Sequence, residues 1–317
     1  KGPTQQSRGL CHLCQAGQAG VGWESLRSRN PPWWPTLHQE SPFRAQSPPA
    51  FLKLHKVPTA EASIFQFDVF HTWHLGIGKY FSASCLAAYS ELFPGNNIDE
   101  RFCNLQSDFF SFCKAESKSA GLTKLSKDTL QWPSKNEFPC GCWFKGSITT
   151  VLCEFLECRL CDPQADLPPL LSKAGEAVAS INKFFKLLYE EDVFIQPDQA
   201  RIISEHGLRF LRRLATLARD SCLAGRPLFL LVPKCHAFHH LLLDMLVPSQ
   251  RGVACFNPLT WSTQQDEDFV GRPSRLSRRV APQRCAERVL QRHLMASHSE
   301  FVKAKYLLSS QGDVQRA

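Results

Sequence analysis

The sequence predicts an α/β protein with a dominant all-helical part, and two observations predict this class. The apolar run over residues 63–70 is typical of a buried strand. Residues 98–225 repeat apolar side chains at the spacing of amphipathic helices. The chain has 317 residues, 43% of them hydrophobic, which suffices for one large or two ordinary domains with a real core.

The amino-acid composition indicates which kind of binding partner and which cellular compartment to expect. The formal net charge of +8 suits an acidic partner such as nucleic acid. The chain has 14 cysteines without a secretory signal, so we expect mostly reduced thiols and an intracellular protein. No apolar run reaches the roughly 18–20 residues that cross a bilayer, and we expect no membrane association.

Residues 1–62 combine a cysteine pair with a Pro/Trp-rich segment that we expect to wrap against the main body. Cys11 and Cys14 form a Cys-x-x-Cys motif, whose short turn can aim two sulfurs at one zinc ion. One such pair supplies only half of a site. Ordinary buried thiols are an equally good interpretation, whereas a redox dithiol is disfavoured because no thioredoxin-like strand precedes it.

Residues 63–97 are predicted to form the strand and a helix over about 71–92 that carries His71 and His74. Asp68 lies at the end of the apolar run. It can cap the helix through the first backbone amides, or it can point a carboxylate at a metal or phosphate. The spacing alone favours the cap.

Residues 98–225 are predicted to be helical throughout. The expected helices lie near residues 100–117, 126–131, 146–161, 173–190 and 198–219. The cysteines at 140, 142, 158 and 161 in this part allow a second zinc site, but scattered core cysteines are the simpler interpretation.

Residues 226–295 are predicted to return to the core, and residues 296–317 form a tail without a usable signal. His236 and His240 are four residues apart, so on a helix they share a face and can bind one metal ion. A hydrogen-bonded pair inside a helical core fits the spacing equally well.

Three acids stand directly before a basic run near the end of this region. Glu267 is flanked by Asp266 and Asp268, and the nearest basic residues are Arg272, Arg275, Arg278 and Arg279. The pattern is typical of a solvated helix with acids at its positive end. The run continues through residues 284, 288 and 292 and can also bind phosphates without sequence specificity.

Four of these motifs, taken in order, resemble those of a known family. They are Cys11-x-x-Cys14, Asp68-x-x-His71 with Leu75-Gly76-Ile77 after it, Pro233-Lys234-x-His236-x-x-x-His240-Leu241, and Asp266-Glu267-Asp268-Phe269-Val270-Gly271. Together they resemble eukaryotic cut-and-paste DDE transposases of the CACTA and related groups. The whole chain also looks like uncharacterised transposon-like proteins of dinoflagellate genomes.

The resemblance implies an RNase H-like core interrupted by a helical insertion, here residues 98–225. It implies phosphodiester hydrolysis and strand transfer with two Mg²⁺ (or Mn²⁺) ions. Asp68 and Glu267 would be the magnesium ligands, and His71 belongs to the same motif as Asp68. DNA would be the partner, a nuclear location would follow, and a homo-oligomer is compatible with the family.

The chain departs from the family at its start. The first acid of the triad should precede the Cys-x-x-Cys motif, but the ten residues before Cys11 contain neither Asp nor Glu. We therefore expect a partial RNase H-like core, inactive alone, in a fragment or a decayed copy.

Further hypotheses concern a zinc site and a role in binding nucleic acid or protein without catalysis. Cys11 and Cys14 would join His236 and His240 in a Cys₂His₂ zinc site, in which His71 or His74 could replace either histidine. A non-catalytic, zinc-stabilised remnant that binds nucleic acid or protein through the Arg272–Arg292 stretch is the alternative to a transposase-derived protein. A helical scaffold without a specific partner is a third interpretation.

Overall fold

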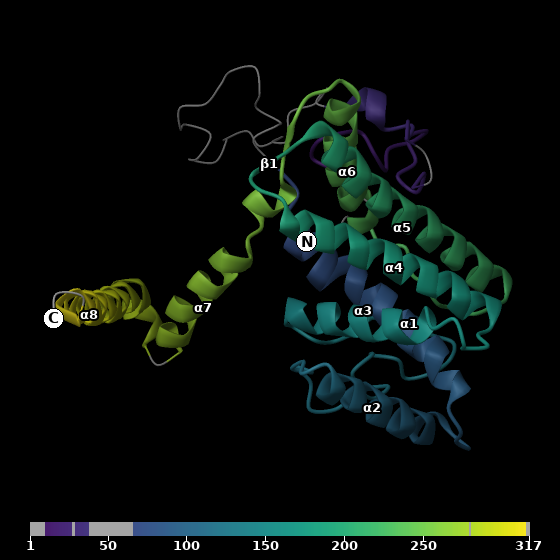
Figure 1. Ribbon diagram of the computed structural model, residues 1–317, viewed down its shortest axis with the longest axis horizontal. Helices are drawn as coiled ribbons and strands as arrows, with labels where there is room; N and C mark the ends of the chain where they lie inside the picture. The colour runs from purple at the N-terminus through teal and green to yellow at the C-terminus, as the bar shows by residue number, and fades with distance from the viewer. Residues whose placement is uncertain (1–9, 27–28, 38–65, 279, 315–317) are drawn as a thin grey trace. The chain divides into compact units, whose positions relative to one another are not determined.

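The computed structural model describes residues 10–26, 29–37, 66–278 and 280–314. The chain separates into two compact units, Lys1–Ser262 and Thr263–Ala317, and helices dominate both (Figure 1). The only sheet among the described residues pairs β1 (Phe194–Ile195) with β2 (Cys255–Phe256) in antiparallel register.

The first unit is a bundle of helices joined by short irregular segments. Its helices are η1 (Trp34–Thr36), η5 (Phe70–Ile77), α1 (Gly78–Tyr89), η6 (Ser90–Leu92), α2 (Ile98–Ala115), α3 (Gly146–Leu160), α4 (Pro169–Glu190), α5 (Pro197–Leu223), α6 (Lys234–Gln250) and η7 (Pro258–Trp261). Helix α5 packs against both α4 and α6, and α4 also packs against α3.

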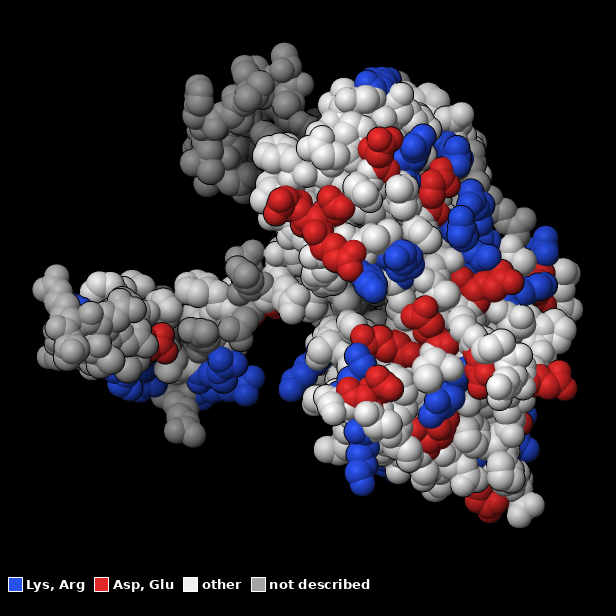
Figure 2. Space-filling model, viewed as in Figure 1, with Lys and Arg blue, Asp and Glu red and all other residues white. Residues whose placement is uncertain are grey.

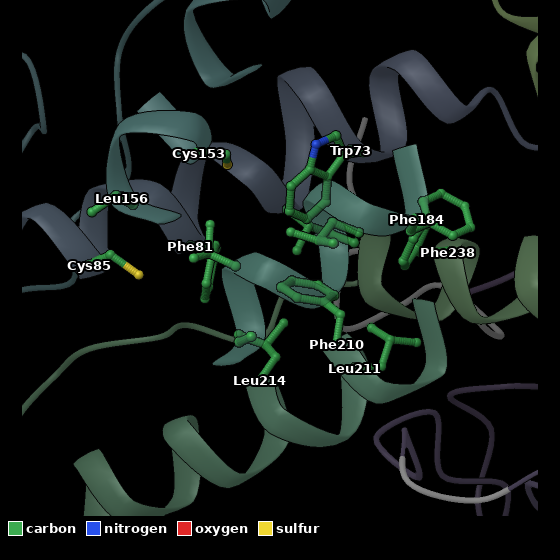
Figure 3. Close-up of a cluster of buried hydrophobic side chains, with 14 of the residues drawn as sticks. Trp73, Phe81, Cys85, Cys153, Leu156, Phe184, Phe210, Leu211, Leu214 and Phe238 are labelled. Atoms are coloured by element: carbon green, nitrogen blue, oxygen red, sulfur yellow. The ribbon is translucent and has the colours of Figure 1, made fainter. Parts of the chain in front are cut away.

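Aromatic side chains fill the centre of this bundle (Figure 3). Trp73 from η5 packs edge-on against Phe210 of α5, with ring centroids 5.1 Å apart. Phe184 of α4 packs in the same way against Phe238 of α6, at 5.4 Å. All four rings are buried, so the large number of phenylalanines in the sequence serves the core.

A glycine sets the spacing between α5 and α6. A Cβ atom added at Gly207 would lie 2.2 Å from a methyl group of Leu242, which is far inside van der Waals contact. The close approach of the two helices at Leu242 therefore requires glycine at this position.

The dominant helical part is confirmed, but two local predictions are wrong. Residues 66–68 are irregular and helix begins by Phe70, so no strand occupies the described part of 63–70; residues 63–65 lie outside the described residues. A short apolar run cannot by itself separate strand from buried helix. Residues 98–225 are not helical throughout, because residues 116–145 contain turns and irregular backbone between α2 and α3. Within them, residues 126–131 form turns, because Ser126 and Thr129 hydrogen-bond each other and nearby backbone groups instead of continuing a helix.

The second unit contains α7 (Gln264–Ser277), η8 (Pro282–Arg284) and α8 (Cys285–Val314). The Nη1 atom of Arg292 in α8 donates to the carbonyl of Leu276 in α7 at 3.4 Å. Phe269 packs edge-on against His293 at 5.4 Å. These contacts hold α7 and α8 together as a helical hairpin.

Candidate metal centre

Four side chains from two distant parts of the chain converge on one point. The thiols of Cys11 and Cys14 and the imidazoles of His236 and His240 each offer a ligand atom, and these atoms lie within 4.8 Å of one another. The Cys14 sulfur lies 3.4 Å from both Nε2 atoms, and the Cys11 sulfur lies 3.6 Å from Nε2 of His240. The two Nε2 atoms are 3.1 Å apart.

These separations fit a tetrahedral zinc ion. Zn–S bonds of about 2.3 Å and Zn–N bonds of about 2.0–2.1 Å, at tetrahedral angles, place sulfur and nitrogen about 3.5 Å apart and two nitrogens about 3.3 Å apart. The three sulfur–nitrogen distances and the nitrogen–nitrogen distance given above differ from these values by only a few tenths of an ångström. The four residues predicted from the sequence can therefore hold one metal ion of the Cys₂His₂ type.

Local structure aims both ligand pairs. In the cysteine loop, the backbone N–H of Leu13 donates to the Cys11 sulfur at 3.3 Å, and the N–H of Leu10 donates to the carbonyl of Ala16 at 2.9 Å. Gly17, at φ +85°, turns the chain back at the end of this loop. His236 and His240 lie in the first two turns of α6, one helical turn apart, so both rings leave the same face.

Trp33 fixes the orientation of the two histidine rings. Its fully buried indole packs edge-on against His236 with centroids 4.6 Å apart, and it packs at a tilt against His240 at 4.1 Å. The Nδ1 atoms of both histidines are buried and have no hydrogen-bond partner among the described residues. Aromatic packing, rather than the carboxylate or carbonyl that often positions a metal-binding histidine, therefore holds these rings.

The electrostatics of the cysteine pair favour a cation. The hydrogen bond from Cys14 is the largest of the effects that lower the pKa of Cys11, and the same contact, followed by burial, raises the pKa of Cys14. One negative charge therefore resides on the pair, because a second thiolate beside it would be repelled. A zinc ion removes that repulsion and binds both sulfurs as thiolates.

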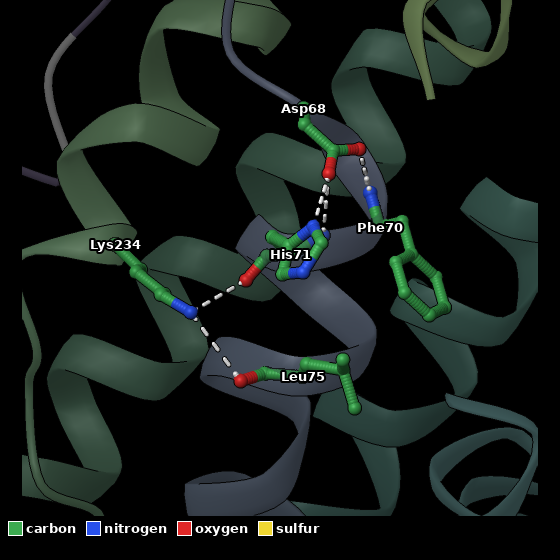
Figure 4. A network of polar contacts seen from close by, with 5 residues as sticks. All are labelled: Asp68, Phe70, His71, Leu75 and Lys234. Carbon is green, nitrogen blue, oxygen red and sulfur yellow. Dashed lines mark hydrogen bonds and ion pairs between the residues drawn. The ribbon is translucent and has the colours of Figure 1, made fainter. Parts of the chain in front are cut away.

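Asp68 and His71 form a separate network at the start of η5 (Figure 4). The Asp68 carboxylate accepts the backbone N–H groups of Phe70 and His71 at 2.8 and 3.2 Å, and it contacts Nδ1 of His71 at 2.5 Å. Lys234 Nζ donates to the carbonyls of His71 and Leu75 at 2.7 and 3.3 Å. Asp68 therefore lies where a helix-capping residue would lie.

Neither His71 nor His74 belongs to the Cys₂His₂ cluster. The His74 ring packs between Phe70 and Phe185, and burial lowers its pKa to about 4. Among the described residues, the Cys₂His₂ cluster is also the only group of three or more such side chains placed to share an ion. Of the other cysteine pairs, 140 and 142 are half-buried and 158 and 161 are exposed.

The remaining predicted residues belong to the second unit, whereas the cluster and Asp68 belong to the first. Glu267 is exposed on α7, and Arg275 and Arg278 are exposed at and just after its end. The side chain of Arg272 and all of Arg279 lie outside the described residues. Asp68 and Glu267 thus belong to different units.

Sequence reasoning missed the contributions of Trp33 and Lys234. Trp33 is one of several tryptophans in the Pro/Trp-rich segment, and nothing in its neighbours distinguishes it. Lys234 offered a usable signal, because it stands two residues before His236 at the start of the helix. From there it reaches the carbonyls of η5 and ties α6 to that helix.

No family model, curated protein or solved structure matches this chain. In the described part of the chain, no helix has the length and apolarity needed to cross a membrane.

Proposed function

We propose that this chain is a zinc-stabilised, non-catalytic nucleic-acid-binding protein derived from a CACTA-like transposase. The observation that carries the proposal is the convergence of Cys11, Cys14, His236 and His240 on one point. The ancestry, the partial RNase H-like core and a nuclear location rest on the motif resemblance alone.

A structural role for zinc follows from the number and burial of the ligands. Four protein ligands complete a tetrahedral shell and leave no position for a substrate or a reactive water. Three of the four residues are buried, and Cys11 is half-buried. Zinc would therefore fasten the N-terminal loop to α6.

The contacts of Asp68 favour a protein that binds nucleic acid without cleaving it. A two-metal nuclease needs carboxylates free to coordinate Mg²⁺. The Asp68 carboxylate accepts two backbone N–H groups and contacts His71, so it is already engaged in holding the start of η5. We therefore expect no Mg²⁺- or Mn²⁺-dependent nicking of plasmid DNA by the chain. Nicking that Asp68→Ala abolishes would instead establish the ancestral activity.

The arginines of the second unit supply the surface for nucleic acid. Between residues 272 and 292 the sequence has seven arginines and a single acid, Glu287. Arg284 ends η8, Arg288 and Arg292 lie at the start of α8, and all three are exposed. Their spacing of four favours a common face where η8 leads into α8. Figure 2 shows blue side chains gathered along one side of this unit. Such a face attracts phosphates irrespective of sequence.

The zinc part is tested by metal analysis of the purified protein. We expect one zinc ion per chain, and we expect Cys14→Ser to lose it. Cys103→Ser is the matched control, because Cys103 is exposed on α2 and belongs to no cluster. Protein free of zinc after purification in zinc-containing buffer, or unchanged zinc content in Cys14→Ser, would contradict the proposal.

The nucleic-acid part is tested by fluorescence anisotropy with a DNA duplex at several salt concentrations. Replacing Arg284, Arg288 and Arg292 with Gln should weaken binding and reduce the salt slope by about 0.9 for each phosphate that the protein no longer neutralises. The control replaces three exposed arginines of α5, Arg201, Arg209 and Arg219, which lie in the first unit. Equal weakening in the two triple variants would show that net charge, and not the face of α8, controls binding.

A further inference from the structure

A cavity of about 330 Å³ opens beside the metal centre, within the first unit. Its walls come from α6, from the segment around β2 and η7, and from Leu13 in the cysteine loop. Most of the lining is apolar, including Leu241, Met245 and Pro258. The volume suits a small organic group.

A single carboxylate interrupts this apolar lining. Asp244 lies on α6 and has no hydrogen-bond or ion-pair partner among the described residues. Burial, followed by the negative charge of Cys11, raises the pKa of Asp244 to about 7. Among the residues that the structure describes, no Lys or Arg lines the cavity. Asp244 is half-buried, and a carboxylate in an apolar wall with no cation from the described residues carries a cost that a bound cation would offset.

Cys255 does not compete with Asp244 as an anion. Burial is the main cause that raises the pKa of this thiol to about 11, so it stays protonated at neutral pH. Asp244 is also outside the group of residues whose ligand atoms can share a metal ion. The negative charge in the cavity is therefore localised on Asp244.

The aromatic side of the cavity carries a second unsatisfied group. The indole N–H of Trp261 is buried and has no hydrogen-bond acceptor among the described residues. The Trp261 ring lies 5.9 Å from Phe256, centroid to centroid, at an angle of 55°, and both rings line the cavity. The faces of aromatic rings attract organic cations.

We propose that this cavity binds an alkylammonium group, with the ammonium on Asp244 and the alkyl stem among the apolar and aromatic walls. The ammonium would donate to the carboxylate, and the stem would replace water along Leu241, Met245 and Phe256. The indole N–H of Trp261 would donate to an acceptor elsewhere in the ligand. A free amine and the lysine side chain of a protein both present this chemistry, and a lysine residue also brings amide carbonyls within reach of such a donor.

The test uses protein-observed NMR of the zinc-loaded full chain at pH 8. The indole N–H signal of Trp261, assigned by its loss in Trp261→Phe, reports on the cavity. The probes are n-butylammonium and 1-butanol, which have the same stem with and without charge, and Nα-acetyl-lysine N-methylamide, which represents a lysine residue. A charge-assisted hydrogen bond contributes about 1.5–3 kcal/mol, so we expect n-butylammonium to bind at least about tenfold more tightly than 1-butanol.

Variants locate the charge that is responsible. Asp244→Asn should weaken n-butylammonium at least about tenfold and leave 1-butanol within about twofold. Asp166→Asn, which changes an exposed carboxylate in the loop before α4, should alter neither. If the unmodified protein binds n-butylammonium no more tightly than 1-butanol, that result alone would overturn the proposal.

The experiment with the lysine derivative distinguishes a free amine from a lysine residue as the natural ligand. If a lysine residue is the natural occupant, its derivative should bind more tightly than n-butylammonium. That advantage should disappear in Trp261→Phe, where the methyl signal of Met245, which also lines the cavity, reports binding instead. If a free amine is the occupant, the two probes should bind alike. Failure of both amines to perturb the Trp261 signal would contradict the assignment while leaving the zinc content of the protein unaffected.

Discussion

The Cys₂His₂ cluster and the Asp68 network both place titratable side chains at the start of a helix, but their polar atoms point in different directions. In the cluster, two sulfurs and two Nε2 atoms face a common point. In the network, Asp68 and Lys234 are directed at backbone N–H and carbonyl groups of η5. One arrangement leaves room for an ion, whereas the other stabilises the helix that contains it.

The difference shows why residue type alone does not define a site. Both motifs have the residues that metals bind, and Asp68-x-x-His71 even has the spacing of a known catalytic motif. Only the direction of the lone pairs separates a ligand set from a cap. Removing zinc and removing the cap should therefore have effects of very different size.

Removal of zinc should give the largest effect. If zinc is present at 1,000 times its dissociation constant, chelation should lower the free energy of unfolding by about 4 kcal/mol. For a domain of this size that corresponds to a fall in Tm of about 8–16 °C. Thermal unfolding with EDTA, and again after zinc is restored in excess, measures the effect. A Tm unchanged by EDTA would mean that the Cys₂His₂ cluster does not stabilise the fold through zinc, and the expected difference from the Asp68 network would not exist.

A change in pH should give an intermediate effect through His74, which lies in η5 but outside the Asp68 network. Its pKa is about 4 in the folded chain against 6.5 for the free group, so protonation favours the unfolded state. This stability is fully present above pH 6.5 and is lost as pH falls toward 4. At pH 5 the loss should be about 2 kcal/mol.

Comparison with His74→Gln isolates this contribution. Urea unfolding of both proteins in EDTA at pH 7.5 and pH 5 prevents the release of zinc from adding to the difference. The variant should lose less stability than the original protein over this range. Parallel pH profiles for the two proteins would mean that His74 titrates normally in the folded state.

Asp68→Ala should give the smallest effect. Loss of a helix-capping carboxylate costs about 0.5–2 kcal/mol. Chemical unfolding measures that cost, and metal analysis should show zinc content equal to that of the original protein. Loss of zinc in Asp68→Ala would mean that the two sites depend on each other, and the comparison between them would fail.

The sequence predicted the ligands of the metal centre better than it predicted the fold around them. Cys11 and Cys14 are close because of the short turn between them, and His236 and His240 share a face because a helix repeats every 3.6 residues. Both statements follow from local geometry. That the two pairs meet depends on how the N-terminal loop reaches α6, and the sequence supplied that step only as a hypothesis.

The features that the sequence could not predict depend on contacts between distant segments. The apolar run over residues 63–70 suits a strand or a buried helix; residues 66–68 are irregular, and Trp73 of the helix that follows packs against Phe210. The cavity beside Asp244 likewise needs β2, η7 and α6 together, and nothing near Asp244 in the sequence marks it. Long-range packing overrides local pattern in both places.

Substitution of zinc by Co²⁺ tests the central claim most directly, because the absorption of Co²⁺ reports both geometry and ligand type. We expect the intense visible bands of tetrahedral Co²⁺ together with thiolate-to-metal charge transfer from two sulfurs. Cys14→Ser should reduce the charge-transfer intensity by about half or abolish binding, and Cys103→Ser should change nothing. Weak bands of a six-coordinate ion, or a spectrum without thiolate charge transfer, would contradict a Cys₂His₂ centre in this protein.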